Sequence, residues 1–155
     1  MLASERVAAP ADAAEFFGIE AGAEICRIKR MHELDGEPLS VVISYLPVEY
    51  AAALTPAALR KPLHEALWEH FGIAQKHSDR AIHVARTDES LARMLQIGLT
   101  DPVLHVRSAV RFDDGRPIRW THNYFREDRY QYVAEGIWQP PRGQSHPPTS
   151  REQPS

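Results

Sequence analysis

Two short stretches of the sequence, at residues 34–42 (LDGEPLSVV) and 112–120 (FDDGRPIRW), contain an Asp-Gly pair with a proline two residues beyond the glycine. An Asp-Gly pair tolerates the positive φ values of a tight chain reversal, and the flanking residues are typical of strands. Each stretch therefore predicts a β-hairpin. Since the two strands of a hairpin run antiparallel, two hairpins commit much of the chain to an antiparallel sheet.

The similarity between the two stretches extends to the residues before them. Residues 14–35 align with 92–113, and 36–46 align with 115–125 once Asp114 is treated as an extra residue in the second turn. Identical pairs in this alignment are Ala14/Ala92, Ile19/Ile97, Asp35/Asp113, Gly36/Gly115, Pro38/Pro117 and Tyr45/Tyr124. Because a helical pattern precedes each hairpin, the alignment predicts a duplicated helix–hairpin unit with a pocket at its seam. The alternative is two unrelated amphipathic hairpins that share only their turn chemistry.

Apolar periodicity and turn residues place the elements along the chain. The expected helices are Ala11–Phe17 closed by Gly18, a helix within 62–72 that stops at Gly72, and a helix over 89–97 capped by Thr87 or Asp88. The expected strands are Glu24–Glu33, Leu39–Leu46, 73–87, 102–112 and 117–125, and Ala51–Leu59 has a helical composition broken at Pro56. Helices beside hairpins of this kind predict an α+β fold.

The length and the composition of the ends set the domain organisation. A chain of 155 residues is large enough for one domain with its own core, and Cys26, the only cysteine, excludes an intrachain disulfide. Residues 139–155 are rich in Pro, Ser and Gln, so we expect a disordered C-terminal tail there. We therefore expect the domain at residues 11–138, with residues 1–10 as an N-terminal connector.

The charge distribution excludes some classes of partner. The formal net charge is −3, and the basic residues are dispersed, so the chain lacks the basic stripe typical of nucleic-acid binding. No apolar run approaches the length of a membrane span, and Glu5 and Arg6 interrupt the region where a secretory signal would be apolar. We therefore expect a cytoplasmic protein that binds neither membranes nor, by itself, DNA.

Four stretches together resemble a known family: ICRIKRMHELDGEPLSVVISYLP, PLHEAL, LARMLQIGLTDPVLHVRSAVRFDDGRPIRW and YFREDRYQY. Their order is similar to that of UTRA (UbiC transcription regulator-associated) domains, the effector-binding domains of GntR-type regulators of the HutC subfamily. The resemblance spans about Ala13 to Tyr132. It implies a chorismate lyase-like fold, in which helices flank a mostly antiparallel β-sheet and a pocket takes a small molecule.

The same resemblance implies partners. Members of the family are homodimers that contact DNA through a winged helix-turn-helix domain, and this chain contains no such domain. It is either part of a longer regulator or a stand-alone sensor, and its sequence leaves both alternatives open.

The resemblance also implies which strand residues bind the ligand. Sugar-phosphate sensors of the family use an Arg-x-Arg motif on the first hairpin, where this chain has Arg30 and His32. Val42 and Arg119 stand where glutamates are frequent, and His64 replaces an aromatic residue. These departures argue against a sugar phosphate and favour an anionic, partly apolar effector, whose identity the sequence does not give.

Strand alternation extends the predicted site, because residues of one parity share a face. The complete ligand-binding set that we expect is Arg30, His32, Val42, Ser44, His64, Arg119, Thr121, Asn123 and Phe125. The guanidinium group of arginine can form paired hydrogen bonds with a carboxylate or a phosphate. The alternative to ligand binding is that Arg30 and Arg119 are solvated or form salt bridges on the surface of the sheet.

The sequence carries no signature of catalysis or of a cofactor. The pairs His64/His70 and His77/His83 are six residues apart, which fits neither a helical nor a strand metal site, and there is no Gly-rich phosphate loop. We therefore expect no metal, no cofactor and no catalytic residue. The alternative is a chorismate lyase-like enzyme acting on a carboxylated molecule, a less favoured interpretation because Val42 and Arg119 replace carboxylates.

Overall fold

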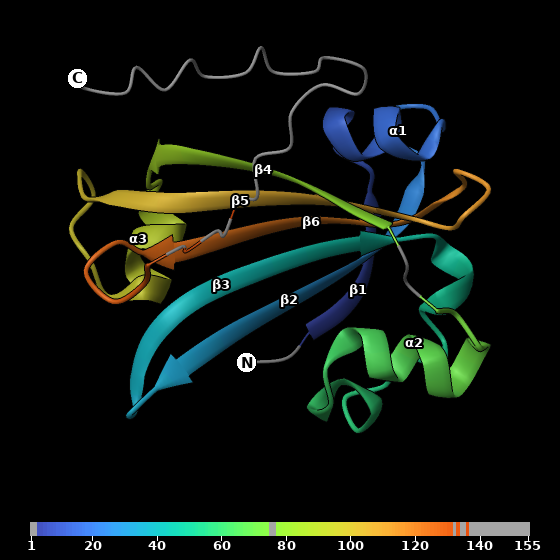
Figure 1. Cartoon of the computed structure of the whole chain (residues 1–155), viewed down its shortest axis with the longest axis horizontal. Helices are drawn as coiled ribbons and strands as arrows, with labels where there is room; N and C mark the ends of the chain where they lie inside the picture. Colours follow the sequence, from blue (N-terminus) through green and yellow to red (C-terminus); the bar gives the residue numbers. More distant parts are fainter. Residues whose placement is uncertain (1–2, 75–76, 132, 134–135, 137–155) are drawn as a thin grey trace, which may run out of the picture.

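The computed structural model describes residues 3–74, 77–131, 133 and 136. Within them, six strands form one antiparallel sheet in the order β1-β2-β3-β6-β5-β4 (Figure 1). The elements are β1 (Ala3–Ala8), α1 (Ala11–Phe17), β2 (Glu24–Leu34), β3 (Glu37–Leu46), α2 (Leu63–Phe71), β4 (His77–Arg86), α3 (Glu89–Leu95), β5 (Pro102–Arg111) and β6 (Pro117–Arg126). The predicted α+β fold is therefore confirmed.

Both predicted hairpins form, with turns of different length. Asp35 and Gly36 have φ values of 53° and 79°, the positive pair of a two-residue turn between β2 and β3. In the second turn the Gly115 N–H donates to the Phe112 carbonyl over 3.0 Å, and Gly115 alone has a positive φ, 87°. The extra residue, Asp114, is therefore accommodated by a longer loop between β5 and β6.

The strand order is symmetric about its centre. β3 and β6 pair in the middle of the sheet, their hairpin partners β2 and β5 lie outside them, and β1 and β4 form the two edges. Each half of the chain thus supplies an edge strand, a helix and a hairpin. This topology is compatible with the predicted duplication, which stays a prediction.

The expectation of a connector at residues 1–10 is wrong for most of that segment. Ala3–Ala8 forms β1, which pairs with β2 from Ala3↔Lys29 to Ala8↔Glu24. Backbone groups of β2 would otherwise lie unpaired at a sheet edge, and two cross-strand ion pairs accompany the pairing, Arg6–Glu24 and Arg27–Glu5. The predicted tail at 139–155 and the end of the domain at residue 138 lie outside the described residues.

The helices divide between the two faces of the sheet. Ala13 and Ala14 of α1 pack with Trp120 and Tyr45, and α3 packs on Val41 of the same face. On the other face, α2 contributes its buried Leu63, Ala66 and Leu67 to a core with Cys26, Ile28, Leu46, Val110 and Ile118. Because α2 is short, this second face is only partly covered (Figure 1).

Local chemistry explains the helix ends. The Asp88 carboxylate accepts a hydrogen bond from the Leu91 N–H over 2.7 Å and so caps α3, as expected. Gly18 and Gly72 end α1 and α2 in the left-handed conformation. The stretch expected to be helical at Ala51–Leu59 contains Pro56, and the structure has only short 3-10 turns nearby, Val48–Tyr50 and Ala58–Arg60. Within the described residues, none of the helices is long and apolar enough to cross a membrane.

Candidate functional site

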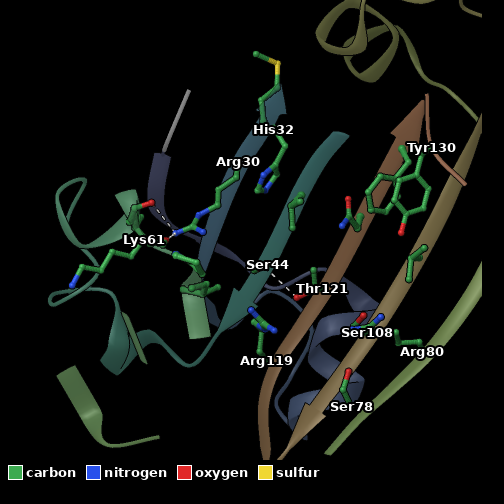
Figure 2. A pocket seen from close by; sticks show the side chains of 18 of the residues that line it. Arg30, His32, Ser44, Lys61, Ser78, Arg80, Ser108, Arg119, Thr121 and Tyr130 are labelled. Atoms are coloured by element: carbon green, nitrogen blue, oxygen red, sulfur yellow. Dashed lines mark hydrogen bonds between the residues drawn. The ribbon is translucent and has the colours of Figure 1, made fainter. Parts of the chain in front are cut away.

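A cavity of about 700 Å³ lies on the face of the sheet that α2 partly covers. Strands β2, β3, β6, β5 and β4 form its floor, and the segment from Leu59 to Leu63 forms one wall (Figure 2). Eight of the nine residues predicted to bind a ligand line it: Arg30, His32, Val42, Ser44, Arg119, Thr121, Asn123 and Phe125. The structure thus brings these residues together, and their role in binding stays a prediction.

Strand register explains why these side chains meet. Ser44 is paired with Thr121 and Val42 with Asn123 across β3 and β6, so both pairs project from the same face. The Ser44 and Thr121 hydroxyls lie 3.1 Å apart, and these residues are only 3% and 7% exposed. The cavity floor therefore crosses the central seam of the sheet, where the sequence predicted a pocket.

Arg30 connects the sheet to the wall of the cavity. Its Nη2 donates to the Leu59 and Lys61 carbonyl oxygens over 2.9 and 2.8 Å (Figure 2). The Nε of Arg30 is buried and has no hydrogen-bond partner among the described residues. Burial lowers the pKa of Arg30, so its environment is unfavourable to the charge it carries. An anion in the cavity would compensate this charge.

Arg119 lines the same cavity and lies below Ser44 and Thr121 in the view of Figure 2. Burial lowers the pKa of Arg119 to about 10, and the positive charges of Arg30 and Arg80 contribute to this lowering. The guanidinium nevertheless stays protonated at neutral pH. Three arginines from β2, β4 and β6 therefore act on one region of the cavity.

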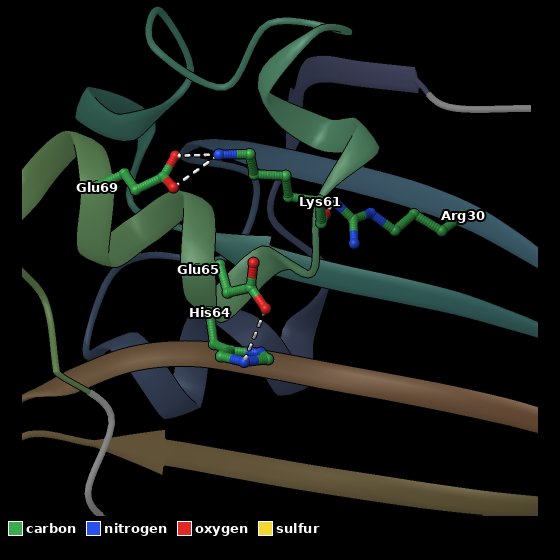
Figure 3. A network of polar contacts seen from close by, with 5 residues as sticks. All are labelled: Arg30, Lys61, His64, Glu65 and Glu69. Carbon is green, nitrogen blue, oxygen red and sulfur yellow. Dashed lines mark hydrogen bonds and ion pairs between the residues drawn. The ribbon is translucent and has the colours of Figure 1, made fainter.

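The charges around the cavity are of one sign. The cationic residues that line it are Arg30, Arg60, Lys61, Arg80 and Arg119, and none of the described lining residues is an aspartate or a glutamate. The Lys61 ammonium turns outward to the Glu69 carboxylate, at 2.7 and 2.9 Å (Figure 3). Burial and the charge of Arg30 lower the pKa of His32 and so disfavour its protonated form. The positive charges that line the cavity therefore attract a negatively charged ligand.

The opposite end of the cavity is apolar and aromatic. The rings of Phe125 and Tyr130 stack with centroids 3.7 Å apart, and Val42 and Val106 lie on the adjoining floor. The Asn123 Oδ1 is buried there without a hydrogen-bond partner among the described residues. A ligand with an anionic part and an apolar part, and with a donor for Asn123, would match this arrangement.

His64 is the one predicted residue that does not line this cavity. It is the second residue of α2, whose buried face consists of Leu63, Ala66 and Leu67, so position 64 points elsewhere. Its side chain is 63% exposed, with Nε2 4.0 Å from the Glu65 carboxylate (Figure 3). His64 instead lines an adjoining cavity.

Sequence reasoning missed several lining residues, among them Lys61, Ser78, Arg80, Ser108 and Tyr130. Ser108 could have been found from alternation, because it is paired with Thr121 across β5 and β6. Ser78 and Arg80 required knowledge that β4 is the edge strand beside β5. Nothing in the local sequence marks Lys61, whose place depends on the packing of α2.

A separate polar cluster lies on the opposite face, between α1 and the sheet. The Asp12 carboxylate accepts from the Trp120 Nε1–H over 2.8 Å and lies 2.7 Å from His122 Nε2, and His122 Nδ1 lies 2.9 Å from His105 Nε2. Burial and the neighbouring histidine charges lower the pKa of His105 to about 4. This cluster fastens α1 to the sheet. Across the described residues, no group of three or more His, Cys, Asp or Glu side chains is placed to hold a metal ion.

Comparison with known sequences identifies relatives among bacterial regulators. The HTH-type transcriptional regulator Rv0792c of Mycobacterium tuberculosis is 28% identical over 113 residues, 70% of this chain and 42% of the relative. The HTH-type transcriptional regulator GgaR of Escherichia coli K12 is 22% identical over 132 residues, 83% of this chain and 51% of the relative. The chain thus spans about half the length of these curated relatives.

Solved structures with a similar fold include domains of GntR-family regulators. A ligand-binding domain from Bordetella bronchiseptica, assigned to the GntR family of transcriptional regulators, matches with a TM-score of 0.80, 21% identity and coverage of 88% of this chain and 90% of that one. The PhnF C-terminal domain matches with a TM-score of 0.75 and 24% identity, over 86% and 85% of the two chains. The family model described as the UTRA domain matches residues 1–131. This protein therefore belongs to the UTRA domain family, and its fold is that of the ligand-binding domains of GntR-family regulators.

Proposed function

We propose that this UTRA domain is the sensing part of a GntR-type transcription regulator and that it binds a small anionic effector in the cavity above β2, β3 and β6. The observation that carries the proposal is the charge of the cavity. Four arginines and Lys61, whose ammonium pairs with Glu69, line it, and no carboxylate is present among its described lining residues. Guanidinium groups form paired, charge-assisted hydrogen bonds with carboxylates and phosphates, so such a cavity selects oxyanions.

Arg30 offers a route from effector binding to conformational change. Its Nη2 holds the carbonyls of Leu59 and Lys61 in the segment that leads into α2. An oxyanion bound by Arg30 would alter the balance of those hydrogen bonds and so shift the position of the segment. An effector that binds one position better than another shifts the population between them, which is how it would change DNA affinity in a regulator.

The DNA-binding part of the proposed regulator would lie outside these 155 residues. The relatives are named HTH-type transcriptional regulators, and this chain spans about half of their length. A helix-turn-helix domain joined to this one, a homodimeric state and a cytoplasmic location remain predictions.

An enzyme is the alternative function, and we propose that it does not apply. Elimination from a carboxylated ring needs an acid or base near the reacting bond. Among the described lining residues of the cavity, aspartate and glutamate are absent, and His32 is the one lining histidine. Incubation with chorismate should therefore yield no 4-hydroxybenzoate above the rate in buffer. Formation of that product at a rate that depends on protein concentration would restore the enzyme hypothesis.

A thermal-shift comparison tests the proposed function. Melting of the wild-type protein is measured at constant ionic strength with citrate, benzoate, phosphate or a neutral polyol. We expect at least one oxyanion to raise the melting temperature in a saturable way, because a ligand that binds only the folded state stabilises it.

The variants Arg30→Gln and Arg93→Gln provide the matched pair for that experiment. Both lose one positive charge, but Arg93 lies on α3 with its side chain 77% exposed. The oxyanion effect should disappear in Arg30→Gln and persist in Arg93→Gln. Equal stabilisation of both variants would contradict the proposed site, since it would show a general effect of salt.

A further inference from the structure

A second cavity adjoins the proposed effector site. It has a volume of about 570 Å³ and extends toward α2, where His64 and Trp68 line it. Ser78, Arg80 and Arg119 line this cavity and also the larger one. Because three residues are common to both, the two cavities meet at the arginine pair of β4 and β6.

The second cavity differs from the first in its chemistry. Its inner surface includes Ile73 and Val110, which are 6% and 2% exposed and belong to the core beneath α2. At its rim the Trp68 side chain is 60% exposed, although an indole of this size gains substantially from burial. Among the described residues that line it there is no aspartate or glutamate. The cavity thus pairs apolar and aromatic surface with a cationic inner end.

From this arrangement we propose that the effector is elongated and amphipathic. Its oxyanion head, a carboxylate or a phosphate, binds the arginines of the larger cavity, Arg30, Arg80 and Arg119, of which the last two also line the second cavity. An aromatic ring on a short spacer extends into the second cavity beside Trp68. This inference rests on the proposed function, because it concerns the same ligand. It assigns to Trp68 and His64 a role in selecting ligand length.

The alternative occupant is a compact anion that fills the larger cavity alone. Such a ligand would leave Trp68 exposed and would derive no affinity from the second cavity. An aromatic ring stacked on the indole would instead bury apolar surface on both partners, which stabilises the complex in proportion to the area covered. Ligand length therefore separates the two arrangements.

The test measures affinity by isothermal titration for two ligand series of increasing length. One series is benzoate, 3-phenylpropanoate and 5-phenylpentanoate, and the other is phenyl phosphate and 4-phenylbutyl phosphate. Comparison of the two series shows whether the site prefers a carboxylate or a phosphate group. For the wild-type protein we expect affinity to rise by about tenfold or more from the shortest to the longest member of the preferred series.

The variant Trp68→Ala should remove most of that gain while leaving the affinity for the shortest member unchanged. Trp68→Phe should retain most of it, because the aromatic face persists. The control Leu99→Ala removes another exposed apolar side chain, 57% exposed and absent from both cavities, and should bind like the wild type.

The outcomes separate this inference from the proposed function. Equal affinity for short and long members of both series would overturn the elongated ligand and leave the anion site intact. The same conclusion would follow if Trp68→Ala kept the full gain with length. Binding of none of these oxyanions would count against the proposed function itself, and with it against the inference.

Discussion

Replacing Arg119 by methionine should stabilise the ligand-free protein and abolish its response to oxyanions. Arg119 lies in the cavity with Arg30 and Arg80 acting on it, and methionine has a similar length without the charge. Burial and neighbouring like charges both disfavour the charged form of a guanidinium and so lower the stability of the folded state, and a bound oxyanion would offset this effect. Stability and function therefore oppose each other at this position.

The magnitude follows from the pKa of Arg119, which burial lowers to about 10, between two and three pH units below its ordinary value. At about 1.4 kcal/mol per pH unit, this difference corresponds to about 3 kcal/mol of destabilisation. Because the folded-state pKa is the lower one, the destabilisation is fully present below pH 10 and is relieved as the pH rises above 10 toward the ordinary pKa of arginine. Methionine also gives up the interactions that Arg119 makes, so we expect a net gain of about 1–2 kcal/mol at pH 7.

Urea unfolding followed by circular dichroism at pH 7 measures this gain. The wild type, Arg119→Met and Arg93→Met are compared with and without the most effective oxyanion at constant ionic strength. Arg93→Met controls for net charge, because its side chain is 77% exposed on α3. A variant Arg119→Met that is less stable than the wild type, or that the oxyanion stabilises as strongly, would refute the reasoning.

Three further predictions concern the frame around the site. Asp88→Ala should lower the free energy of unfolding by about 1 kcal/mol because α3 loses its cap, and Asp88→Ser should restore most of it in urea unfolding. Asp12→Asn should destabilise by about 1–3 kcal/mol, since the charged acceptor shared by Trp120 and His122 is lost; an unchanged melting temperature would contradict this. The pKa of His105 is lowered from 6.5 to about 4, so the unfolded state binds its proton first as the pH falls. Wild-type stability should therefore decrease from pH 6.5 toward pH 4 more steeply than that of His105→Gln, and equal slopes in pH-dependent unfolding would contradict this.

The hairpins were predictable from the sequence because turn chemistry is local. Asp35 and Gly36 supply the two positive φ values of the first turn, and Gly115 supplies the one that the second requires. Alternation then placed Ser44 and Thr121 on one face without knowledge of the partner strands. Features that depend on residues close together in the sequence could thus be predicted from the sequence.

Features that depend on packing between segments far apart in the sequence could not be predicted from the sequence. The polar sequence of β1 did not indicate a strand, because it forms only through edge pairing with β2. Arg80 and Lys61 reach the cavity through the placement of β4 and of the segment before α2, which no local pattern specifies. His64 was expected from family position alone, and the orientation of α2 directs it to the adjoining cavity instead.

A nuclear magnetic resonance titration of the ¹⁵N-labelled domain with the best oxyanion tests the central claim, binding in the cationic cavity, most directly. Saturable shifts are expected for the side-chain Nε–H of Arg30 and Arg119 and for the amides of Ser44 and Thr121. The Trp120 indole N–H, which donates to Asp12 on the opposite face, should change little. Shifts centred on Trp120 and His122, or no saturable shift in the arginines, would contradict the account.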